Sequence, residues 1–161
     1  MVSPSTYYHH PFKIYLVPAL KIRTASPADL PAITNLLAAN KLPFAGVAEH
    51  VASFLVADVD GDLVGTAGLE IYGEGGLLRS VAVDPRFRNK GIGDKLSSLI
   101  LQLADERAVR EVYLLTTTAE GYFAKKGFIK TTRDNVAVGV LASEEFRGAC
   151  PETAVIMKKI L

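Results

Sequence analysis

Cysteine is almost absent from this sequence, with Cys150 as the single thiol among 161 residues. One thiol cannot form an internal disulfide, so the composition favours a reducing compartment, and we expect a cytoplasmic protein. No stretch approaches the roughly 18 consecutive apolar residues that span a bilayer, so no membrane partner is expected. Residues 1–20 also lack the charged start, long apolar run and small-residue cleavage site of a signal peptide.

An excess of either charge is also missing, because 18 Lys and Arg face 17 Asp and Glu, for a formal net charge of +1. A dedicated nucleic-acid-binding protein usually carries a basic excess, so no nucleic-acid partner is expected. His9 and His10 are too few for a metal site, and no metal is expected. The content of 49% hydrophobic and 22% charged residues is typical of a globular protein. We predict an N-terminal extension over residues 1–20 and a single domain over 21–161.

Hydrophobic periodicity and turn residues predict a mixed α/β domain. A strand over 21–25 precedes a helix over 26–40, whose start combines a capping Ser26 with Pro27 in the first helical position. Three strands joined by tight turns then imply an antiparallel meander; they cover 54–59, 62–72 and 77–83. The remaining predicted elements are a helix over 94–108, a buried strand over 112–115, a helix over 119–126, a strand over 128–132 and a closing strand from 154.

The segment Arg88-Asn89-Lys90-Gly91-Ile92-Gly93 lies between an apolar strand and an amphipathic helix. A helix start presents free backbone N–H groups and the positive end of the helix dipole, which together bind anions. Gly91 and Gly93 carry no side chain, so the backbone can close around a phosphate. The segment is neither a nucleotide-triphosphate loop nor a dinucleotide fingerprint, because it lacks the Gly-Lys-Ser/Thr ending of the first and the third glycine of the second.

Three motifs in this order resemble the GCN5-related N-acetyltransferase (GNAT) superfamily: Val81-Ala82-Val83-Asp84-Pro85, the Arg88-to-Gly93 segment, and the segment from Ala119 to Phe128. A closer resemblance links the segment 114–123, with Leu77-Leu78-Arg79-Ser80 upstream, to two groups. One is the small acetyltransferases encoded in arsenic-resistance clusters, and the other is the acetyltransferase domain of N-acetylglutamate synthases. The segment from Ser143 to Met157 is similar to the arsenic-cluster group in particular.

The resemblance implies an α/β, GNAT-like fold with a mixed, mostly antiparallel sheet of about six to seven strands and about four flanking helices. It also implies direct transfer of the acetyl group of acetyl-CoA to an amine, and it is compatible with a homodimer. The subgroup implies a small-molecule acceptor, an amino acid or glutamate-like compound. The residues implied to bind the CoA moiety are Val81, Ala82, Val83, Arg88, Asn89, Lys90, Gly91, Ile92, Gly93 and Phe123.

The acceptor side of the reaction has several candidate residues. Glu70 is the candidate base, acting directly or through water, although a solvent-facing strand residue explains it equally well. Arg79 interrupts an apolar strand and is a candidate clamp for a substrate carboxylate; an ion pair with Glu70 or Glu111 is the alternative. Thr117 and Arg147 are further candidates for substrate binding.

Tyr122 marks a departure from the family pattern. Many members carry a tyrosine acid five residues before the phenylalanine of the Gly127-Phe128 pair, and this sequence has Phe123 there. One residue is about 100° around a helix, so Tyr122 cannot simply take that role. It is kept as a catalytic-site candidate for contact with the substrate or CoA.

Three functions fit these observations. The main hypothesis is an N-acetyltransferase for a small molecule. A protein or peptide acetyltransferase is the second, although a net charge near zero offers no preference for basic tails. The third is a catalytically weak acyl-CoA-binding regulatory module, which the absence of tyrosine at position 123 keeps open.

Overall fold

The computed structural model of the chain describes residues 6–10, 13–17 and 19–161, with side chains from residue 19 onward. Its α-helices are α1 (Leu30–Ala39), α2 (Val47–His50), α3 (Ile92–Glu106) and α4 (Glu120–Lys125). Its main sheet contains β3 (Leu20–Thr24), β4 (Phe54–Val59), β5 (Asp62–Tyr72), β6 (Gly75–Val83), β7 (Glu111–Thr116), β8 (Ile129–Thr131) and β9 (Val155–Ile160). A separate two-stranded sheet pairs β1 (Thr6–His10) with β2 (Lys13–Val17).

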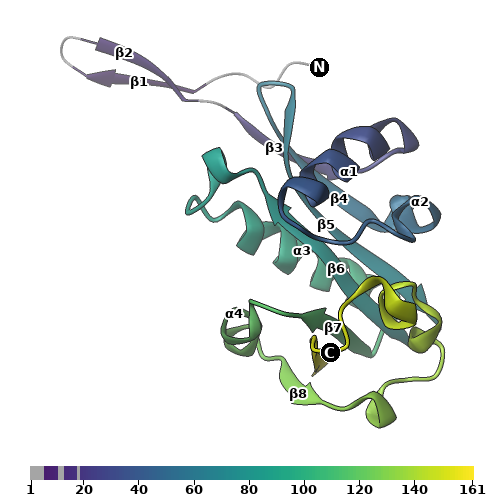
Figure 1. Cartoon of the computed structure of the whole chain (residues 1–161). Coiled ribbons are helices and arrows are strands. Elements are labelled where there is room, and N and C mark those ends of the chain that lie inside the picture. The colour runs from purple at the N-terminus through teal and green to yellow at the C-terminus, as the bar shows by residue number, and fades with distance from the viewer. Residues whose placement is uncertain (1–5, 11–12, 18) are drawn as a thin grey trace.

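The strands of the main sheet follow the order β3-β4-β5-β6-β7-β9-β8 (Figure 1). All neighbouring strands are antiparallel except β6 and β7, which are parallel. The predicted mixed, mostly antiparallel sheet of six to seven strands with about four helices is therefore confirmed. The predicted extension over 1–20 falls partly outside the described residues, which lack 1–5, 11–12 and 18.

Local sequence signals explain the N-terminal half of the fold. Ser26 and Asp29 form the reciprocal hydrogen bonds of a capping box just before α1. Asp29 also pairs with Arg23 on β3 at 2.8 Å, which ties the helix start to the edge of the sheet. The turn between β4 and β5 has positive φ at both Asp60 and Gly61, as the tight turn of a twisted hairpin requires.

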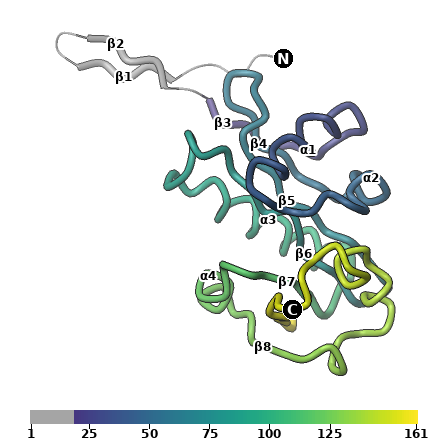
Figure 2. Tube along the Cα trace, in the orientation of Figure 1, coloured from purple at the N-terminus to yellow at the C-terminus, as the bar shows by residue number. Residues whose placement is uncertain are grey.

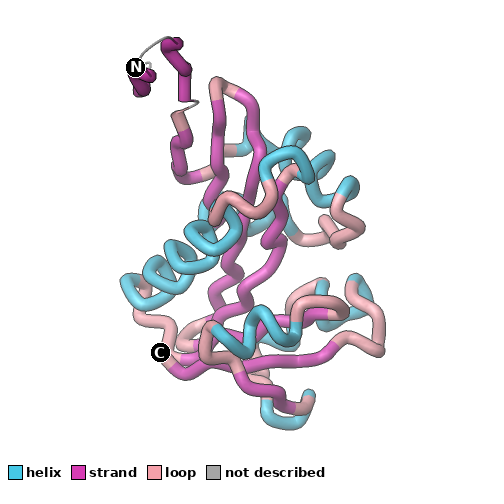
Figure 3. Tube along the Cα trace, turned by 90° about the vertical axis from the view of Figure 1, so that its left-hand side faces the viewer, coloured by secondary structure: helices cyan, strands magenta, loops and turns pink. Residues whose placement is uncertain are grey.

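Helices cover both faces of the sheet, and Figure 3 shows them on either side of the strands. Successive residues of β4 point to opposite faces: Val56 packs with α1 in one apolar cluster, and Ala57 packs with α3 in another. A third cluster, made by Leu77, Tyr113, Val136, Val140 and Phe146, anchors the chain that follows β8. Figures 1 and 2 show that this C-terminal segment returns to lie beside β6 and β7.

The sheet is interrupted between β6 and β7, and this interruption positions the site. The two strands pair only where Gly75–Leu77 meets Glu111–Tyr113. Beyond Leu77, β6 carries a bulge in which Ser80 and Val81 oppose the single residue Ala67 of β5, and Ser80 has a φ of 59°. A bulge bends its strand and increases the local twist, so the two parallel strands separate toward their carboxyl ends.

Candidate functional site

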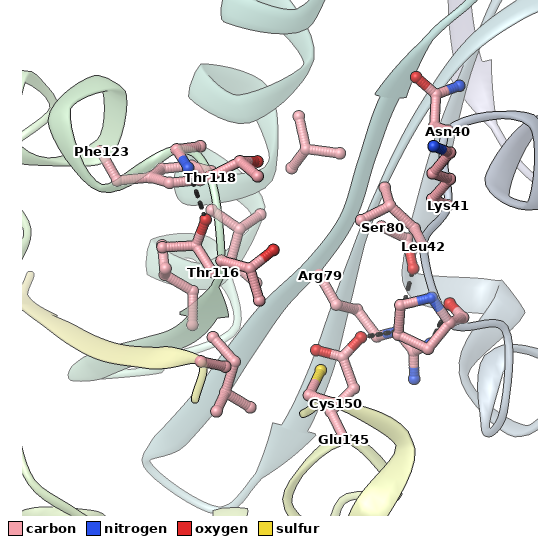
Figure 4. A pocket seen from close by; sticks show the side chains of 18 of the residues that line it. Asn40, Lys41, Leu42, Arg79, Ser80, Thr116, Thr118, Phe123, Glu145 and Cys150 are labelled. Carbon is pink, nitrogen blue, oxygen red and sulfur yellow. Dashed lines mark hydrogen bonds and ion pairs between the residues drawn. The ribbon is translucent and has the colours of Figure 1, made fainter. Parts of the chain in front are cut away.

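The separation of β6 and β7 produces a cavity of about 370 Å³ (Figure 4). Beyond Leu77 the edge of β6 that faces this cavity pairs with no strand in the described part of the chain. Its backbone N–H and C=O groups are therefore available to a ligand. The lining comes from five regions: the loop after α1, β6, the loop before α3, the end of β7 with α4, and the C-terminal segment. The lining includes Lys41, Arg79, Val81, Arg88, Thr117 and Glu145.

The loop from Arg88 to Gly93 borders one end of the cavity, which we call the donor end. Gly91 takes a φ of 78° immediately before α3, and a Cβ there would meet no atom within 4 Å. The left-handed backbone, and not packing, therefore favours glycine at this position. The first turn of the 15-residue α3 presents unpaired N–H groups beside two cationic side chains, Arg88 and Lys90, so this end can hold a phosphate.

Arg88 is the residue of this loop that reaches the cavity lining. Its Nη2 donates to the Asn40 Oδ1 at 2.5 Å, and the Asn40 side chain in turn donates to the Leu36 carbonyl at the end of α1. Lys90 lies beside Phe87, with its Nζ 6.0 Å from the ring centre. The donor end is thus joined to the loop after α1 through Arg88 and Asn40.

The other residues predicted to bind CoA are spread around this end. Val81 and Phe123 line the cavity. Ala82 and Ile92 are buried in the two main apolar clusters, so their side chains serve the core. Gly93 lies against β6, since a Cβ there would come within 3.4 Å of the Val83 Cγ2. Asn89 adopts a φ of 62° in the turn before α3.

Arg79 dominates the opposite end of the cavity, which we call the acceptor end. Its side chain has no exposed area, and its Nη1 lies 2.8 Å from the Glu70 Oε2. It also donates to the carbonyls of Ala45 (2.7 Å) and Pro43 (3.2 Å), which fixes the loop after α1. The ion pair with Glu70 is therefore present, whereas Glu111 pairs with Lys158 instead.

Glu70 is 1% exposed, so the expectation of a solvent-facing strand residue is wrong. Its strand is covered by α1 and α2, and its carboxylate accepts hydrogen bonds from Arg79 and Tyr72, with the His50 Nε2 at 3.4 Å. Glu70 is not among the residues that line the cavity. Burial raises the pKa of Tyr72 above its usual range, and its bond to Glu70 adds to the effect, so the phenol donates a proton in this bond.

Two of the three remaining candidates, Tyr122 and Arg147, lie away from the cavity. Tyr122 is 38% exposed and donates to the Asp94 Oδ1 at 3.3 Å. Lys126 also binds Asp94 and lowers the pKa of that carboxyl. The Arg147 side chain is 64% exposed and lies 3.8 Å from Glu144. Thr117, in contrast, lines the cavity at the end of β7.

Sequence reasoning missed Glu145, which lines the acceptor end and is 5% exposed. Its Oε2 lies 3.3 Å from the Arg79 Nε (Figure 4). Burial raises the pKa of Glu145 to about 7, with the charge of Arg79 opposing the rise and that of Glu70 adding to it. The only signal in the sequence was its place in the C-terminal segment that resembles the arsenic-cluster acetyltransferases.

Within residues 6–10, 13–17 and 19–161, no helix combines the length and apolar character needed to cross a membrane. The same residues contain no group of three or more His, Cys, Asp or Glu side chains arranged to hold a metal ion.

Comparison with known proteins supports a single family. Residues 50–130 match the acetyltransferase (GNAT) domain. An uncharacterized N-acetyltransferase of Chlorobaculum tepidum is 32% identical over 115 residues, covering 66% of this chain and 74% of that protein. The amino-acid acetyltransferase of Mycobacterium tuberculosis is 34% identical over 117 residues, covering 66% of this chain and 67% of that protein. For the amino-acid acetyltransferase of Neisseria meningitidis, 27% identical, the match covers 29% of its length, so this chain corresponds to a part of it.

Solved structures share the fold. The N-acetylglutamate synthase of Neisseria gonorrhoeae, complexed with coenzyme A and N-acetyl-glutamate, has a TM-score of 0.76 at 23% identity, over 89% of this chain and 35% of that one. The Mycobacterium tuberculosis protein Rv2747, in complex with CoA and NLQ, has a TM-score of 0.68 at 27% identity, over 88% of this chain and 99% of that one. This chain therefore belongs to the GNAT acetyltransferase family, and it is an acetyl-CoA-dependent N-acetyltransferase related to amino-acid acetyltransferases.

Proposed function

We propose that this chain transfers the acetyl group of acetyl-CoA directly to the amine of an amino acid or a glutamate-like small molecule. The observation that carries the proposal is one cavity whose two ends differ in chemistry. Arg88 borders the donor end, and Arg79, Lys41 and Glu145 line the rest of the wall. Two substrates held in one enclosed space react as if at very high concentration, which supplies much of the rate.

At the donor end, the pyrophosphate of CoA would bind the backbone N–H groups of Gly91 and Gly93, with Arg88 and Lys90 neutralising its charge. The free edge of β6 at Val81 would hydrogen-bond the pantetheine arm. A backbone N–H on this edge would polarise the thioester carbonyl, because fixed donors stabilise the negative charge that develops on its oxygen. Phe123 would close the cavity on the opposite side.

At the acceptor end, Arg79 retains capacity for a substrate carboxylate. Guanidinium has five N–H donors, and its hydrogen bonds to Ser80, Ala45, Glu70 and Pro43 use four of them within the described residues. The fifth, on Nη2, would bind one carboxylate oxygen. Lys41 lines the same cavity and would serve a second carboxylate, which favours an acidic amino acid such as glutamate.

The size of the cavity favours a small acceptor over a protein. A volume of about 370 Å³ leaves room for only a small acceptor beside the acetylated end of the donor, and the loop after α1 is tied down by Arg79 across one side of the cavity. The relative from Mycobacterium tuberculosis named amino-acid acetyltransferase points in the same direction. A regulatory module that only binds acyl-CoA would not need a second, charged end in its cavity.

Release of free thiol from acetyl-CoA in the presence of single amino acids tests the proposal. We expect turnover with at least one amino acid, and with L-glutamate before lysine or a basic peptide. The Lys41→Met variant should raise the KM for glutamate more than that for glutamine, because only glutamate carries the second carboxylate. Absence of turnover with every amine, together with intact binding of CoA by calorimetry, would show that the chain is not an amino-acid acetyltransferase.

A further inference from the structure

The acceptor end contains a buried carboxylate to which the proposed function has so far given no role. Glu145 lies in the C-terminal segment between β8 and β9 and is 5% exposed. Its backbone N–H donates to the Ser143 Oγ at 3.2 Å, and the adjacent Phe146 is buried in the third apolar cluster. These two contacts hold the Glu145 side chain at a fixed place in the cavity wall.

Two buried carboxylates share one buried guanidinium at this place. The Arg79 Nη1 lies 2.8 Å from Glu70, and its Nε lies 3.3 Å from Glu145. With His50 neutral, the cluster therefore carries one uncompensated negative charge whenever both carboxylates are ionised. A buried charge without a partner is unfavourable, so either a proton or a cation in the cavity stabilises the cluster.

The two carboxylates are not equivalent. Glu70 has the shorter ion pair with Arg79, accepts a hydrogen bond from Tyr72, and lies outside the cavity lining. Glu145 has the longer ion pair and lines the cavity. Glu145 is therefore the carboxylate that a ligand can reach, and a positively charged group of the ligand would pair with it.

We propose that the Glu145 carboxylate binds the ammonium group of the acceptor and takes one of its protons, as the general base of acetyl transfer. This inference rests on the proposed function, since it requires an amine acceptor in the cavity. It assigns the base to a residue of the C-terminal segment and leaves Glu70 as a positioning residue that holds Arg79. No base acting from β5 is then needed.

The proton balance of the reaction follows from this placement. The acceptor ammonium gives one proton to Glu145, and the neutral amine attacks the thioester carbonyl. The C–N bond forms, the C–S bond breaks, and the electron pair of that bond leaves on sulfur. The nitrogen releases its second proton as the amide forms, and the thiolate takes up one proton. One proton per turnover passes from Glu145 to solvent, which restores the carboxylate.

The charged groups around Glu145 make such a base effective near neutral pH. Arg79 from β6 faces it, Glu70 from β5 lies behind Arg79 with Tyr72 and His50, and Cys150 lies on its own segment. Burial raises the pKa of the Cys150 thiol to about 12, so Cys150 stays neutral there. A carboxylate of raised pKa is a stronger base than an exposed one and still ionises at the pH of the cell.

The test compares three single variants for acetylation of the amino acid that the wild type uses best, starting with L-glutamate. Glu145→Gln keeps the shape of the side chain and removes the base. Glu70→Gln makes the same change in the other partner of Arg79. Glu144→Gln is the matched control, because Glu144 is the neighbouring, half-exposed carboxylate and does not line the cavity. Calorimetric binding of acetyl-CoA and circular dichroism are measured for each.

We expect Glu145→Gln to lower kcat/KM for the acceptor about 100-fold or more, within the usual contribution of a general base, while the affinity for acetyl-CoA stays within about twofold. The wild-type rate should rise with pH through an apparent pKa of about 7, as Glu145 loses its proton. The rate of Glu145→Gln should instead rise toward the pKa of the acceptor amine itself. Glu70→Gln should keep the rise of the rate with pH but shift it to lower pH, because the charge of Glu70 raises the pKa of Glu145. Glu144→Gln should keep both the rate and the profile.

An active wild type together with an unchanged rate and pH profile in Glu145→Gln would overturn this inference and leave the proposed function standing. The inference would also be overturned if the rise of the rate through an apparent pKa near 7 were lost in Glu70→Gln as well as in Glu145→Gln. Both residues would then act only through Arg79. A wild type that acetylates no amine overturns the proposed function and this inference with it. If Glu145→Gln does not fold, Glu145→Asp is measured in its place. A lower rate that still rises with pH as one carboxylate loses its proton supports the role of Glu145 as the base, and a wild-type rate contradicts it.

Discussion

The two ends of the cavity are built in opposite ways. The donor end is one continuous segment, Arg88 to Gly93, which offers backbone N–H groups and cationic side chains at the start of α3. The acceptor end joins Glu70, Arg79 and Glu145, which are distant in sequence and almost fully buried. A site made of backbone tolerates changes of side chain, whereas a buried charge cluster fails when one member is lost. The donor site can therefore be predicted from a sequence motif, whereas the acceptor site depends on contacts that form only in the folded protein.

Loss of Arg79 should have the largest effect, because it leaves two buried carboxylates without their cation. We expect Arg79→Ala to lower the free energy of unfolding by about 3–5 kcal/mol, the usual cost of breaking a buried ion pair. In conditions where the variant folds, its affinity for the amino acid should fall more than its affinity for acetyl-CoA. Urea denaturation and calorimetry measure the two effects.

Arg147→Ala is the control for that experiment, since Arg147 is mostly exposed and pairs only loosely with Glu144. It should change the free energy of unfolding by less than about 1 kcal/mol, as exposed ion pairs do. Equal and small losses for both arginines would show that the acceptor end is not held together by its charges.

Gly91→Asp should have the next largest effect, and it acts on the donor end alone. The substitution places a carboxylate where the pyrophosphate is proposed to lie, on a backbone with a φ of 78°. We expect acetyl-CoA to bind about 100-fold more weakly, which corresponds to about 2.7 kcal/mol. Gly73→Asp is the matched control, because Gly73 also has a positive φ and open space around it, at the turn between β5 and β6. Equal weakening by both variants would mean that backbone strain, and not the phosphate site, causes the loss.

Arg88→Ala should weaken acetyl-CoA binding about tenfold, and the effect should shrink as salt is added, because exposed charges are screened. The KM for the acceptor should stay the same, since Arg88 borders the donor end. Arg107→Ala removes the same charge at the far end of α3 and should leave acetyl-CoA binding unchanged. A salt-independent loss for Arg88→Ala would indicate that its bond to Asn40 matters for structure instead.

Thr117→Val should have the smallest effect. It removes one hydroxyl from the cavity wall and keeps the shape of the side chain, so at most one hydrogen bond of about 1 kcal/mol is lost. We expect the KM for the acceptor to rise severalfold, with the affinity for acetyl-CoA unchanged. Thr131→Val, on the edge strand β8, serves as the control for the substitution itself. No change in KM would remove Thr117 from the acceptor site.

Local signals in the sequence predicted much of the fold. The strands over 54–59 and 62–72 coincide with β4 and β5, because an apolar pattern is bounded there by the Asp60-Gly61 turn. The long helix begins two residues earlier than predicted, since the left-handed Gly91 ends the loop and Ile92 already belongs to α3. Both features depend on neighbours along the chain, which a sequence displays.

The acceptor end could not be predicted in the same way. Glu145 lies in a segment without a strong periodic pattern, and its burial follows from the packing of Phe146 against Leu77 and Tyr113. Glu70 fits the pattern of an ordinary alternating strand residue, and its burial beside Arg79, Tyr72 and His50 arises only in the folded protein. Contacts between residues 70, 79 and 145 form when β5 pairs with β6 and the segment after β8 packs beside them, so no single segment encodes these contacts.

The structure of the protein with CoA and the amino acid that it acetylates tests the central claim most directly, that one cavity holds the donor and the acceptor at opposite ends. We predict the pyrophosphate at the N–H groups of Gly91 and Gly93, and the acceptor amine in hydrogen-bonding contact with Glu145. The acceptor carboxylate should lie against Arg79. An acceptor bound outside the space between β6 and β7, or with its amine turned away from Glu145, would contradict this account.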